Sequence, residues 1–186
     1  MIIIVEGVDR VGKSTMCERL KREFNFRVFH DDYKPNYITI KPESDKEKLL
    51  IDDCINVKFS LIMQFMSMWD NIIIDRFHFT EFVYNHMRGQ AFKGFQKIDR
   101  VLSKLNVHLV LVKSENIIES SKQHGEDLRV HEAMFKSLYH SSRVPYKYCT
   151  SYSEINSTIL EIKMNEALRV VSKVEIPKEE QLSWNL

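Results

Sequence analysis

The chain has 186 residues, of which 44% are hydrophobic and 28% are charged, and its formal net charge at pH 7 is +1. This length suits one domain with a sizeable core, and the composition excludes a disordered or fibrous protein. A net charge so close to zero excludes a general electrostatic attraction to nucleic acids or membranes.

We expect a cytoplasmic protein without a membrane partner. The first apolar run starts at Ile2, which leaves no length for a signal peptide, and no apolar run has the length of a membrane span. The three cysteines, Cys17, Cys54 and Cys149, lie far apart without the spacing of a zinc site or a disulfide framework. We expect them to be reduced packing residues, as is usual inside cells.

Five short apolar runs predict the strands of one parallel sheet. They alternate with stretches of helical periodicity, as in α/β folds with crossover helices. Most of their residues are apolar and follow one another nearly without interruption, which indicates that both faces of the sheet are covered. The predicted strands are 2–6, 27–30, 71–75, 107–113 and 146–149.

Helices are predicted wherever apolar residues recur three or four positions apart. The predicted helices are 13–24, 45–69, 79–87, 92–105 and 153–169. The longest carries one apolar stripe, made of Leu49, Leu50, Cys54, Val57, Leu61, Met68 and Trp69. Its cluster of Met63, Phe65, Met66 and Met68 is interpreted as core.

These elements belong to one predicted domain, residues 1–169. The Pro-containing stretch 31–45 is a loop long enough to carry function. The polar segment 120–129 contains a glycine and is interpreted as a mobile lid. Residues 170–186 are expected to form a surface tail rather than a separate domain.

The first strand runs directly into Gly7-x-x-x-x-Gly12-Lys13-Ser14. This spacing is typical of a phosphate-binding loop, in which backbone N–H groups and the positive end of the next helix hold phosphates. Lys13 would contact phosphate oxygens, and the Ser14 hydroxyl would coordinate Mg²⁺. We therefore predict ATP and Mg²⁺ as cofactors. The predicted nucleotide-binding residues are Gly7, Val8, Val11, Gly12, Lys13, Ser14 and Thr15.

Two Asp-Arg pairs accompany predicted strand ends, namely Asp9-Arg10 inside the loop and Asp75-Arg76 after the third strand. The carboxyl ends of parallel strands share one edge, where ligands bind in open α/β folds. Arg10 would stabilise charge on a transferring phosphoryl group. Asp75 would hold magnesium through water or orient the attacking oxygen, and Arg76 would grip an anionic acceptor. The alternative is that each pair is only an ion pair at the surface.

The stretch EGVDRVGKST (6–15), followed by IIIDRFHFTEFVY (72–84), resembles the thymidylate kinase family, within the wider group of nucleoside and nucleotide kinases. The resemblance implies a three-layer α/β/α P-loop fold with a five-stranded parallel sheet. It also implies transfer of the γ-phosphoryl group of ATP to a deoxynucleoside monophosphate such as dTMP. Members of the family often form dimers through helices, so a homodimer is a further expectation.

The same resemblance implies roles for individual residues. Asp9 would contact the sugar of the acceptor, Arg10 would assist transfer, Arg76 would hold the acceptor phosphate and Tyr84 would pack against the sugar. The lid would close over ATP with Arg129. The residues expected to carry catalysis are Asp9, Arg10, Lys13 and Asp75, and the expected magnesium ligands are Ser14 and Asp75.

The sequence departs from the family after the second strand. It has no arginine between Val28 and Asp75, whereas thymidylate kinases carry one for the acceptor phosphate and another, on the long helix, that reads the thymine. Lys58 and Gln64 lie on that helix, but such residues are usually at the surface, and no role is assigned to them. In place of the first arginine stands FHDDYKP (29–35), whose two acids would repel a phosphate.

Those acids suit a hydroxyl group that must lose a proton. The alternative function is therefore a kinase that acts on a hydroxyl of a free deoxynucleoside, or of a hydroxymethylated base in DNA, with Asp32 at the substrate. A third interpretation is a nucleotide-dependent regulatory switch. It would need a residue that positions a hydrolytic water, and none is evident in the sequence.

Overall fold

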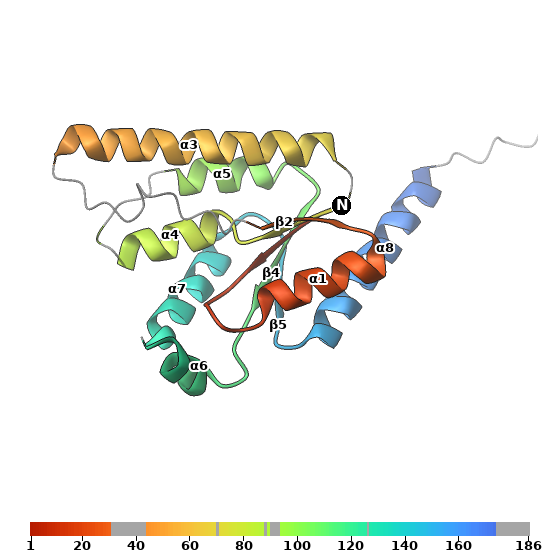
Figure 1. Cartoon of the computed structure of the whole chain (residues 1–186). Helices are drawn as coiled ribbons and strands as arrows, with labels where there is room; N and C mark the ends of the chain where they lie inside the picture. Colours follow the sequence, from red (N-terminus) through yellow and green to blue (C-terminus); the bar gives the residue numbers. More distant parts are fainter. Residues whose placement is uncertain (31–43, 70, 88, 90–93, 126, 174–186) are drawn as a thin grey trace, which may run out of the picture.

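The structure is a computed structural model that describes residues 1–30, 44–69, 71–87, 89, 94–125 and 127–173. Its centre is one sheet of five parallel strands (Figure 1), in the order β2-β3-β1-β4-β5. The strands are β1 (Ile2–Glu6), β2 (Arg27–His30), β3 (Ile72–Asp75), β4 (Val107–Val112) and β5 (Tyr146–Cys149). The five predicted parallel strands are thus confirmed, with boundaries that differ by at most one residue.

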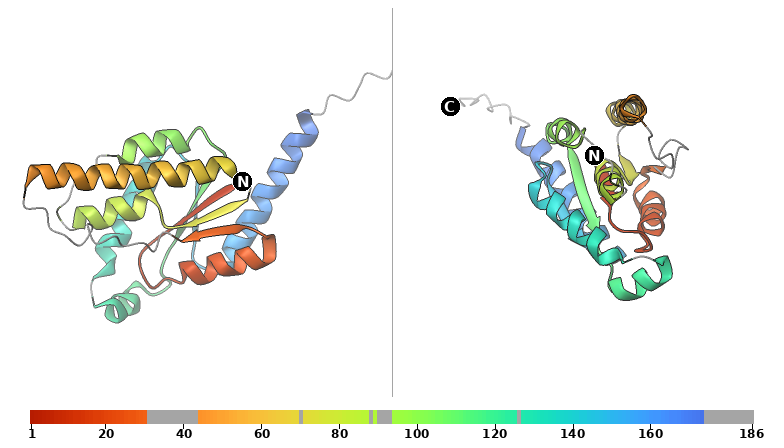
Figure 2. Two further views of the ribbon diagram at one scale, coloured as in Figure 1. Left: turned by 45° about the horizontal axis from the view of Figure 1, so that its top comes forward. Right: turned by 90° about the vertical axis from the view of Figure 1, so that its left-hand side faces the viewer.

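Helices cover both faces of the sheet (Figure 2), which confirms the expected three-layer α/β/α architecture. They are α1 (Lys13–Phe24), α3 (Asp45–Met68), α4 (His78–Met87), α5 (Phe95–Leu102), α6 (Ile117–His124), α7 (Leu128–Ser141) and α8 (Tyr152–Lys173). None of the helices in the described part of the chain combines the length and apolarity that crossing a bilayer requires.

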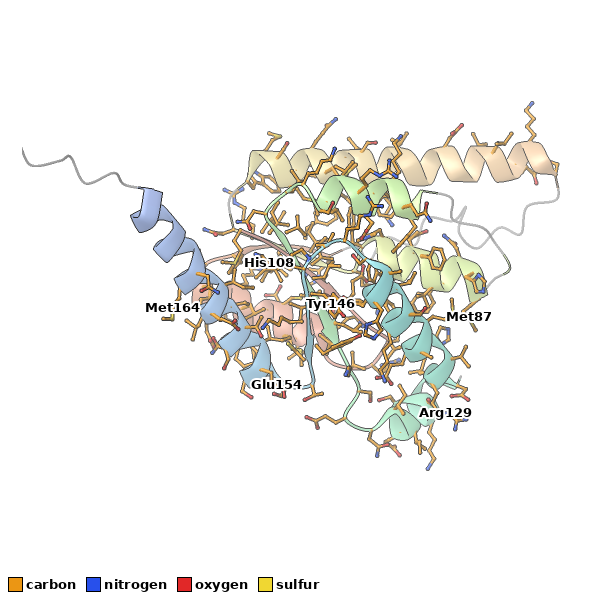
Figure 3. The ribbon with its side chains drawn as sticks, turned by 180° about the vertical axis from the view of Figure 1, so that it is seen from behind. Met87, His108, Arg129, Tyr146, Glu154 and Met164 are labelled. Carbon is orange, nitrogen blue, oxygen red and sulfur yellow. The ribbon has the colours of Figure 1, made fainter. Side chains whose placement is uncertain are left out.

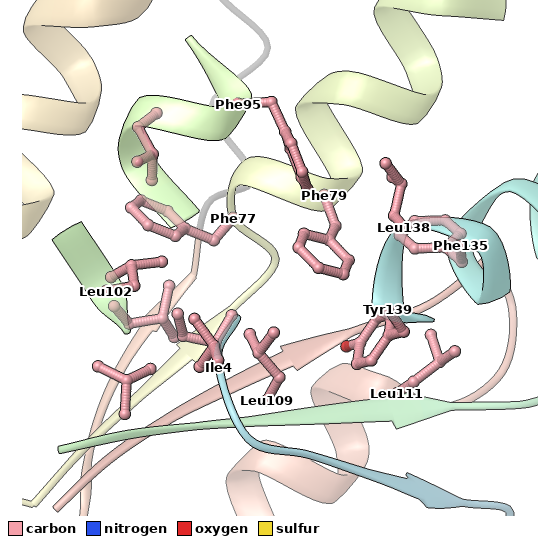
Figure 4. Close-up of a cluster of buried hydrophobic side chains, with 14 of the residues drawn as sticks. Ile4, Phe77, Phe79, Phe95, Leu102, Leu109, Leu111, Phe135, Leu138 and Tyr139 are labelled. Atoms are coloured by element: carbon pink, nitrogen blue, oxygen red, sulfur yellow. The ribbon is translucent and has the colours of Figure 1, made fainter. Parts of the chain in front are cut away.

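Alternate residues of each strand enter two separate cores. Ile3 and Val5 of β1 pack against α1 and α8. Ile2 and Ile4 face the larger core, which also receives side chains from α3, α4, α5 and α7. Aromatic rings fill that larger core, shown in Figure 4: Phe77, Phe79, Phe95 and Tyr139. Burial on both faces explains why the strands read as continuous apolar runs.

The apolar stripe of α3 largely faces solvent. Of the cluster interpreted as core, Met66 is buried and Met63 packs against the core, but Met68 is exposed, so the interpretation was wrong for Met68. The exposed residues are Leu49, Leu50, Val57, Leu61 and Met68. The helix instead buries a second stripe, made of Phe59, Ile62 and Met66. Both stripes are apolar at helical spacing, and periodicity alone does not show which one meets the sheet.

The segment predicted as a lid, 120–129, is mostly helical, and the sequence analysis missed α7 altogether. Asn116 begins α6 by accepting a hydrogen bond from the Glu119 N–H (3.2 Å), and Gly125 ends it with φ of 80°. Asp127 then begins α7 by accepting from the Arg129 N–H (3.1 Å). Within the segment interpreted as a lid, Gly125 therefore ends one helix and Asp127 begins the next. At the other end of the chain, α8 continues to Lys173, beyond the predicted domain end at 169.

Gly7 allows β1 to turn into the phosphate-binding loop beside β4. Its φ is +141°, and a Cβ at this position would collide with the carbonyl oxygen of Val112. A side chain is therefore excluded by both backbone conformation and space.

Glu6, the last residue of β1, joins that strand to the start of α4. Its fully buried carboxylate accepts hydrogen bonds from the backbone N–H groups of Phe77 (3.0 Å), Phe79 (3.1 Å) and Thr80 (3.2 Å), and from the Thr80 hydroxyl. These donors include N–H groups that the first turn of a helix leaves without partners. Burial raises the pKa of Glu6 to about 7, although the hydrogen bonds from Thr80 and Phe79 oppose that shift.

Replacing Gly7 by alanine should destabilise the protein strongly, by at least about 3 kcal/mol, because a forbidden φ adds to a backbone collision. Gly125→Ala is the matched control, since Gly125 also has a positive φ but no atom within 4 Å of an added Cβ. We expect this control to cost only about 1–2 kcal/mol. Urea unfolding of both variants measures the difference, and equal losses would contradict the close approach to Val112.

Replacing Glu6 by glutamine should change how stability depends on pH. The folded-state pKa of Glu6, about 7, lies above its ordinary value of 4.5, so the folded protein binds more protons between these values. The contribution of Glu6 to the free energy of unfolding is thus fully present below pH 4.5 and is lost as pH rises through about 7. In the wild type, the free energy of unfolding should therefore decline by up to about 3 kcal/mol as pH rises, and we expect Glu6→Gln to remove this decline.

Urea unfolding at several pH values measures this slope in the wild type and in Glu6→Gln. Glu161→Gln serves as a control, because the Glu161 side chain is 57% exposed and pairs with Lys147 at the surface. An unchanged slope in Glu6→Gln would show that the raised pKa is wrong.

Candidate active site

The phosphate-binding loop occupies the expected place between β1 and α1. Val8 is buried, Val11 is half-buried, Thr15 is exposed on α1, and Gly12 begins the helix with φ of 81°. Lys13 is only 3% exposed, and its ammonium group donates to the carbonyl oxygen of Val8. Burial lowers the pKa of Lys13 to about 8, so the side chain remains largely protonated at neutral pH. A bound phosphate would offer this cation a stronger partner than a carbonyl group.

Ser14 and Asp75 form the place where a magnesium ion would fit. The Ser14 hydroxyl, at the start of α1, donates to Asp75 Oδ2, at the end of β3, at 2.6 Å. The second oxygen of Asp75 is buried and has no hydrogen-bond partner among the described residues. Hydroxyl and carboxylate oxygens are ligands that Mg²⁺ prefers, with waters and phosphate oxygens completing its coordination. The described residues contain no group of three or more His, Cys, Asp or Glu arranged to hold a metal, so the nucleotide would supply much of that shell.

His30 belongs to the same network, although the sequence analysis gave it no role. Its Nδ1 lies 3.0 Å from Asp75 Oδ2, and its Nε2 lies 3.2 Å from Glu18 Oε1. The ring thereby connects the ends of β2 and β3 with α1. The available signal was its place as the last residue of a predicted strand, because all the strands end at the same edge.

The two Asp-Arg pairs interlock across this edge. The Arg76 guanidinium binds the Asp9 carboxylate, so the partner of Asp9 comes from the other pair, 67 residues away. Burial alone would raise the pKa of Asp9, but the charge and hydrogen bond of Arg76, with smaller contributions from Lys13 and Tyr84, together outweigh it and lower this pKa to about 2. Arg10 and Arg76 both have positive φ, 66° and 73°. Backbone strain of this kind is concentrated at functional sites.

Tyr84 lies near Asp9 and Arg76, the residues predicted to contact an acceptor. Burial, followed by the nearby charge of Asp9, raises the pKa of Tyr84 to about 12. Its ring stacks on His131 of α7 with a centroid distance of 5.3 Å. His131 is 3% exposed, and its Nδ1 has no hydrogen-bond partner within the described part of the chain. The sequence analysis missed this histidine because it missed α7.

Arg10 lies at a surface hollow of about 470 Å³ beside the phosphate-binding loop. The loop, the segment after β4 and the segment after β5 line it together. Among the lining residues are Arg10, Val11, Lys113, Asn116, Thr150 and Ser151. A nucleoside attached to phosphates in the loop would find room here.

Two predicted site residues are not placed with the others. Arg129, which is labelled in Figure 3, lies in the first turn of α7 and forms an ion pair with Asp127 (2.6 Å). It lines a separate hollow of about 410 Å³ together with Lys122, so its contact with ATP stays a prediction. Asp32, like Asp31, lies outside the described residues.

Comparison with protein-family models and with curated proteins found no match. Solved structures do match over nearly the whole chain. YorR from Bacillus subtilis, in complex with phosphorylated GDP, has a TM-score of 0.61 and 18% identity, covering 90% of this chain and 98% of that one. Thymidylate kinase from Candida albicans has a TM-score of 0.55 and 15% identity, covering 89% and 92%.

Deoxyadenosine kinase from M. mycoides, with dCMP and dCDP bound, has a TM-score of 0.51 and 15% identity, covering 91% of this chain and 100% of that one. At such identities the likeness concerns the fold. The chain has the fold of the thymidylate-kinase-like P-loop kinases.

Proposed function

We propose that the protein is a kinase that transfers the γ-phosphoryl group of ATP, with Mg²⁺, to a deoxynucleoside monophosphate. One observation carries the proposal: Asp75 binds Ser14 of the phosphate-binding loop while its neighbour Arg76 binds Asp9 of the same loop. The residues suited to the donor and those suited to the acceptor therefore meet at one edge of the sheet.

On the donor side, the loop N–H groups and Lys13 would hold the phosphates of ATP. Lys13 would exchange the Val8 carbonyl oxygen for phosphate oxygens, which is favourable because the ammonium is buried and bears a charge. Arg10, exposed beside the hollow for the nucleoside, would stabilise charge that develops on the transferring group.

On the acceptor side, Arg76 would hold the phosphate of the monophosphate, and Asp9 and Tyr84 would contact its sugar. The ion pair between Asp9 and Arg76 orients both groups before the acceptor binds. Ser14 and Asp75 would hold magnesium, which would neutralise charge on the phosphates. The protein contributes mainly position and a fixed electrostatic environment.

The solved structures with this fold support a nucleotide or nucleoside substrate. Two of them are named as thymidylate kinase and deoxyadenosine kinase, and the third holds phosphorylated GDP. The localisation in the cytoplasm stays a prediction. A homodimer also stays a prediction, supported by the exposed stripe of α3, whose Leu50, Val57, Leu61 and Met68 follow the heptad spacing of helix–helix seams.

The alternative acceptor is a hydroxyl group of a deoxynucleoside or of a hydroxymethylated base in DNA. One observation favours it: His30 places the end of β2 against Asp75, and Asp31 and Asp32 follow directly in the sequence. A base for removing a hydroxyl proton would be needed near this point.

An ADP-release assay with ATP and Mg²⁺ tests the proposal against a panel of deoxynucleoside monophosphates, free deoxynucleosides and hydroxymethylated DNA. We expect turnover with a monophosphate and a loss of more than about 100-fold in kcat/KM for Lys13→Ala, which removes a phosphate-binding cation. Turnover only with nucleosides or modified DNA would favour the alternative. ADP release that needs no acceptor would indicate a nucleotide-dependent switch.

Arg76→Ala should raise the KM for a monophosphate acceptor about 10- to 100-fold, because it removes a charged hydrogen bond to the phosphate. The KM for ATP should change little. Arg27→Ala is the control, since Arg27 begins β2 at the opposite edge of the sheet and stacks over Trp69. An unchanged acceptor KM in Arg76→Ala would count against a monophosphate.

A further inference from the structure

A largely buried ion pair joins α3 to α4 and has no part in the chemistry described so far. Glu81 of α4 is 8% exposed. Its Oε2 lies 3.4 Å from the Lys58 ammonium of α3, and its Oε1 accepts a hydrogen bond from the Asn85 amide at 3.1 Å. Taking such a pair out of water is costly, and apolar residues could fill the same space. The pair therefore calls for an explanation beyond packing.

The pair lies next to the residues assigned to the acceptor. Glu81 and Tyr84 are three positions apart on α4, so they are neighbours on its surface. Arg76 lies just before the same helix. If Arg76 holds the acceptor phosphate and Tyr84 its sugar, the remaining part of the acceptor, its base, falls beside Glu81 and Lys58. The inference thus rests on the proposed function.

The carboxylate of Glu81 keeps capacity for further hydrogen bonds. A carboxylate has about four acceptor positions, and the contacts of Glu81 with Lys58 and Asn85 use two. The contact with Lys58, at 3.4 Å, is longer than the ~2.7–2.9 Å of a strong charge-assisted hydrogen bond. A base edge that offers donors to Glu81 and an acceptor to Lys58 would improve both groups' interactions.

We propose that Glu81 and Lys58 read the acceptor base and that this base is guanine. Guanine presents two adjacent donors, N1–H and the N2 amino group, which match the two oxygens of a carboxylate. Its O6, next to N1, would accept from the Lys58 ammonium, as lysine does from guanine in DNA.

The other bases fit less well. Thymine would turn the carbonyl oxygens that flank its N3–H toward the carboxylate. Cytosine and adenine each offer only an amino group beside an acceptor nitrogen. The choice of guanine departs from the thymine that the family resemblance implies, and it agrees with the lack of an arginine on the long helix.

Binding to the wild-type protein provides the first test and needs no substitution. Isothermal titration with saturating ADP, which fills the donor site, compares dGMP, dIMP, dTMP, dCMP and dAMP, and the ADP-release assay gives kcat/KM for each. We expect dGMP to be preferred over dTMP by about 100-fold, and dIMP, which lacks the N2 amino group, to bind about 10-fold more weakly than dGMP. Deoxyguanosine and deoxyinosine are compared in the same way, to test the preference for guanine if the acceptor is a nucleoside hydroxyl.

The outcomes separate the two proposals. If a thymine, cytosine or adenine acceptor has the highest kcat/KM, or if dIMP and dGMP bind and react equally well, the proposal that the base is guanine is overturned. The kinase function stands in that case. Turnover with none of the acceptors would overturn the kinase function and this inference with it.

Glu81→Gln provides the second test, because glutamine keeps the shape but replaces one acceptor oxygen by a donor. We expect the preference for dGMP over dTMP to fall at least about 10-fold, with the Kd for ATP unchanged. Asp99→Asn is the matched control: Asp99 is also a buried carboxylate, on α5, but it binds Ser142 and Arg143 instead. Replacing Asp99 should not alter the order in which the acceptor bases are preferred. If Glu81→Gln also leaves this order unchanged, the inference is overturned.

Discussion

The buried carboxylate of Glu6 is the constraint on which the geometry of the site depends. It stands where β1 becomes the phosphate-binding loop, and its partners are N–H groups at the start of α4. A buried carboxylate without donors would cost several kcal/mol, so these hydrogen bonds restrict how far α4 can move relative to β1. The contacts of Asp9 with Arg76 and of Ser14 with Asp75 form between segments that Glu6 already holds together.

Within that frame, the cations of the site are bound to acceptors of the protein itself. Lys13 contacts a loop carbonyl group, and Arg76 contacts Asp9. Each cation is thereby held near the position in which it would bind a phosphate, either in place of its present partner or together with it. An environment of fixed charges that needs little rearrangement is the main means by which phosphoryl transfer is accelerated. Arg76 follows the end of β3 and Lys13 begins α1. The groups that we propose discriminate between acceptors, Lys58 and Glu81, lie instead on α3 and α4.

Much of the fold could be predicted because its signals are local. Apolar β-branched runs marked all five strands, and the spacing of Gly7, Gly12 and Lys13 marked the loop between a strand and a helix. The prediction failed where one local signal has two meanings. Gly125 and Asp127 suit a loop or a helix cap equally well, and here they end α6 and begin α7. The roles predicted for Asp9, Arg10, Arg76 and Tyr84 remain predictions that activity measurements must test.

The sequence by itself determined the five strands, most of the helices and the phosphate-binding loop, because these follow from patterns within a few residues. The tertiary structure alone decided that Asp9 pairs with Arg76, that His30 reaches Asp75, and that Lys58 reaches Glu81. It also decided which stripe of α3 is buried. These outcomes depend on contacts between segments far apart in the chain, and no local pattern specifies which distant side chain will fill a given space.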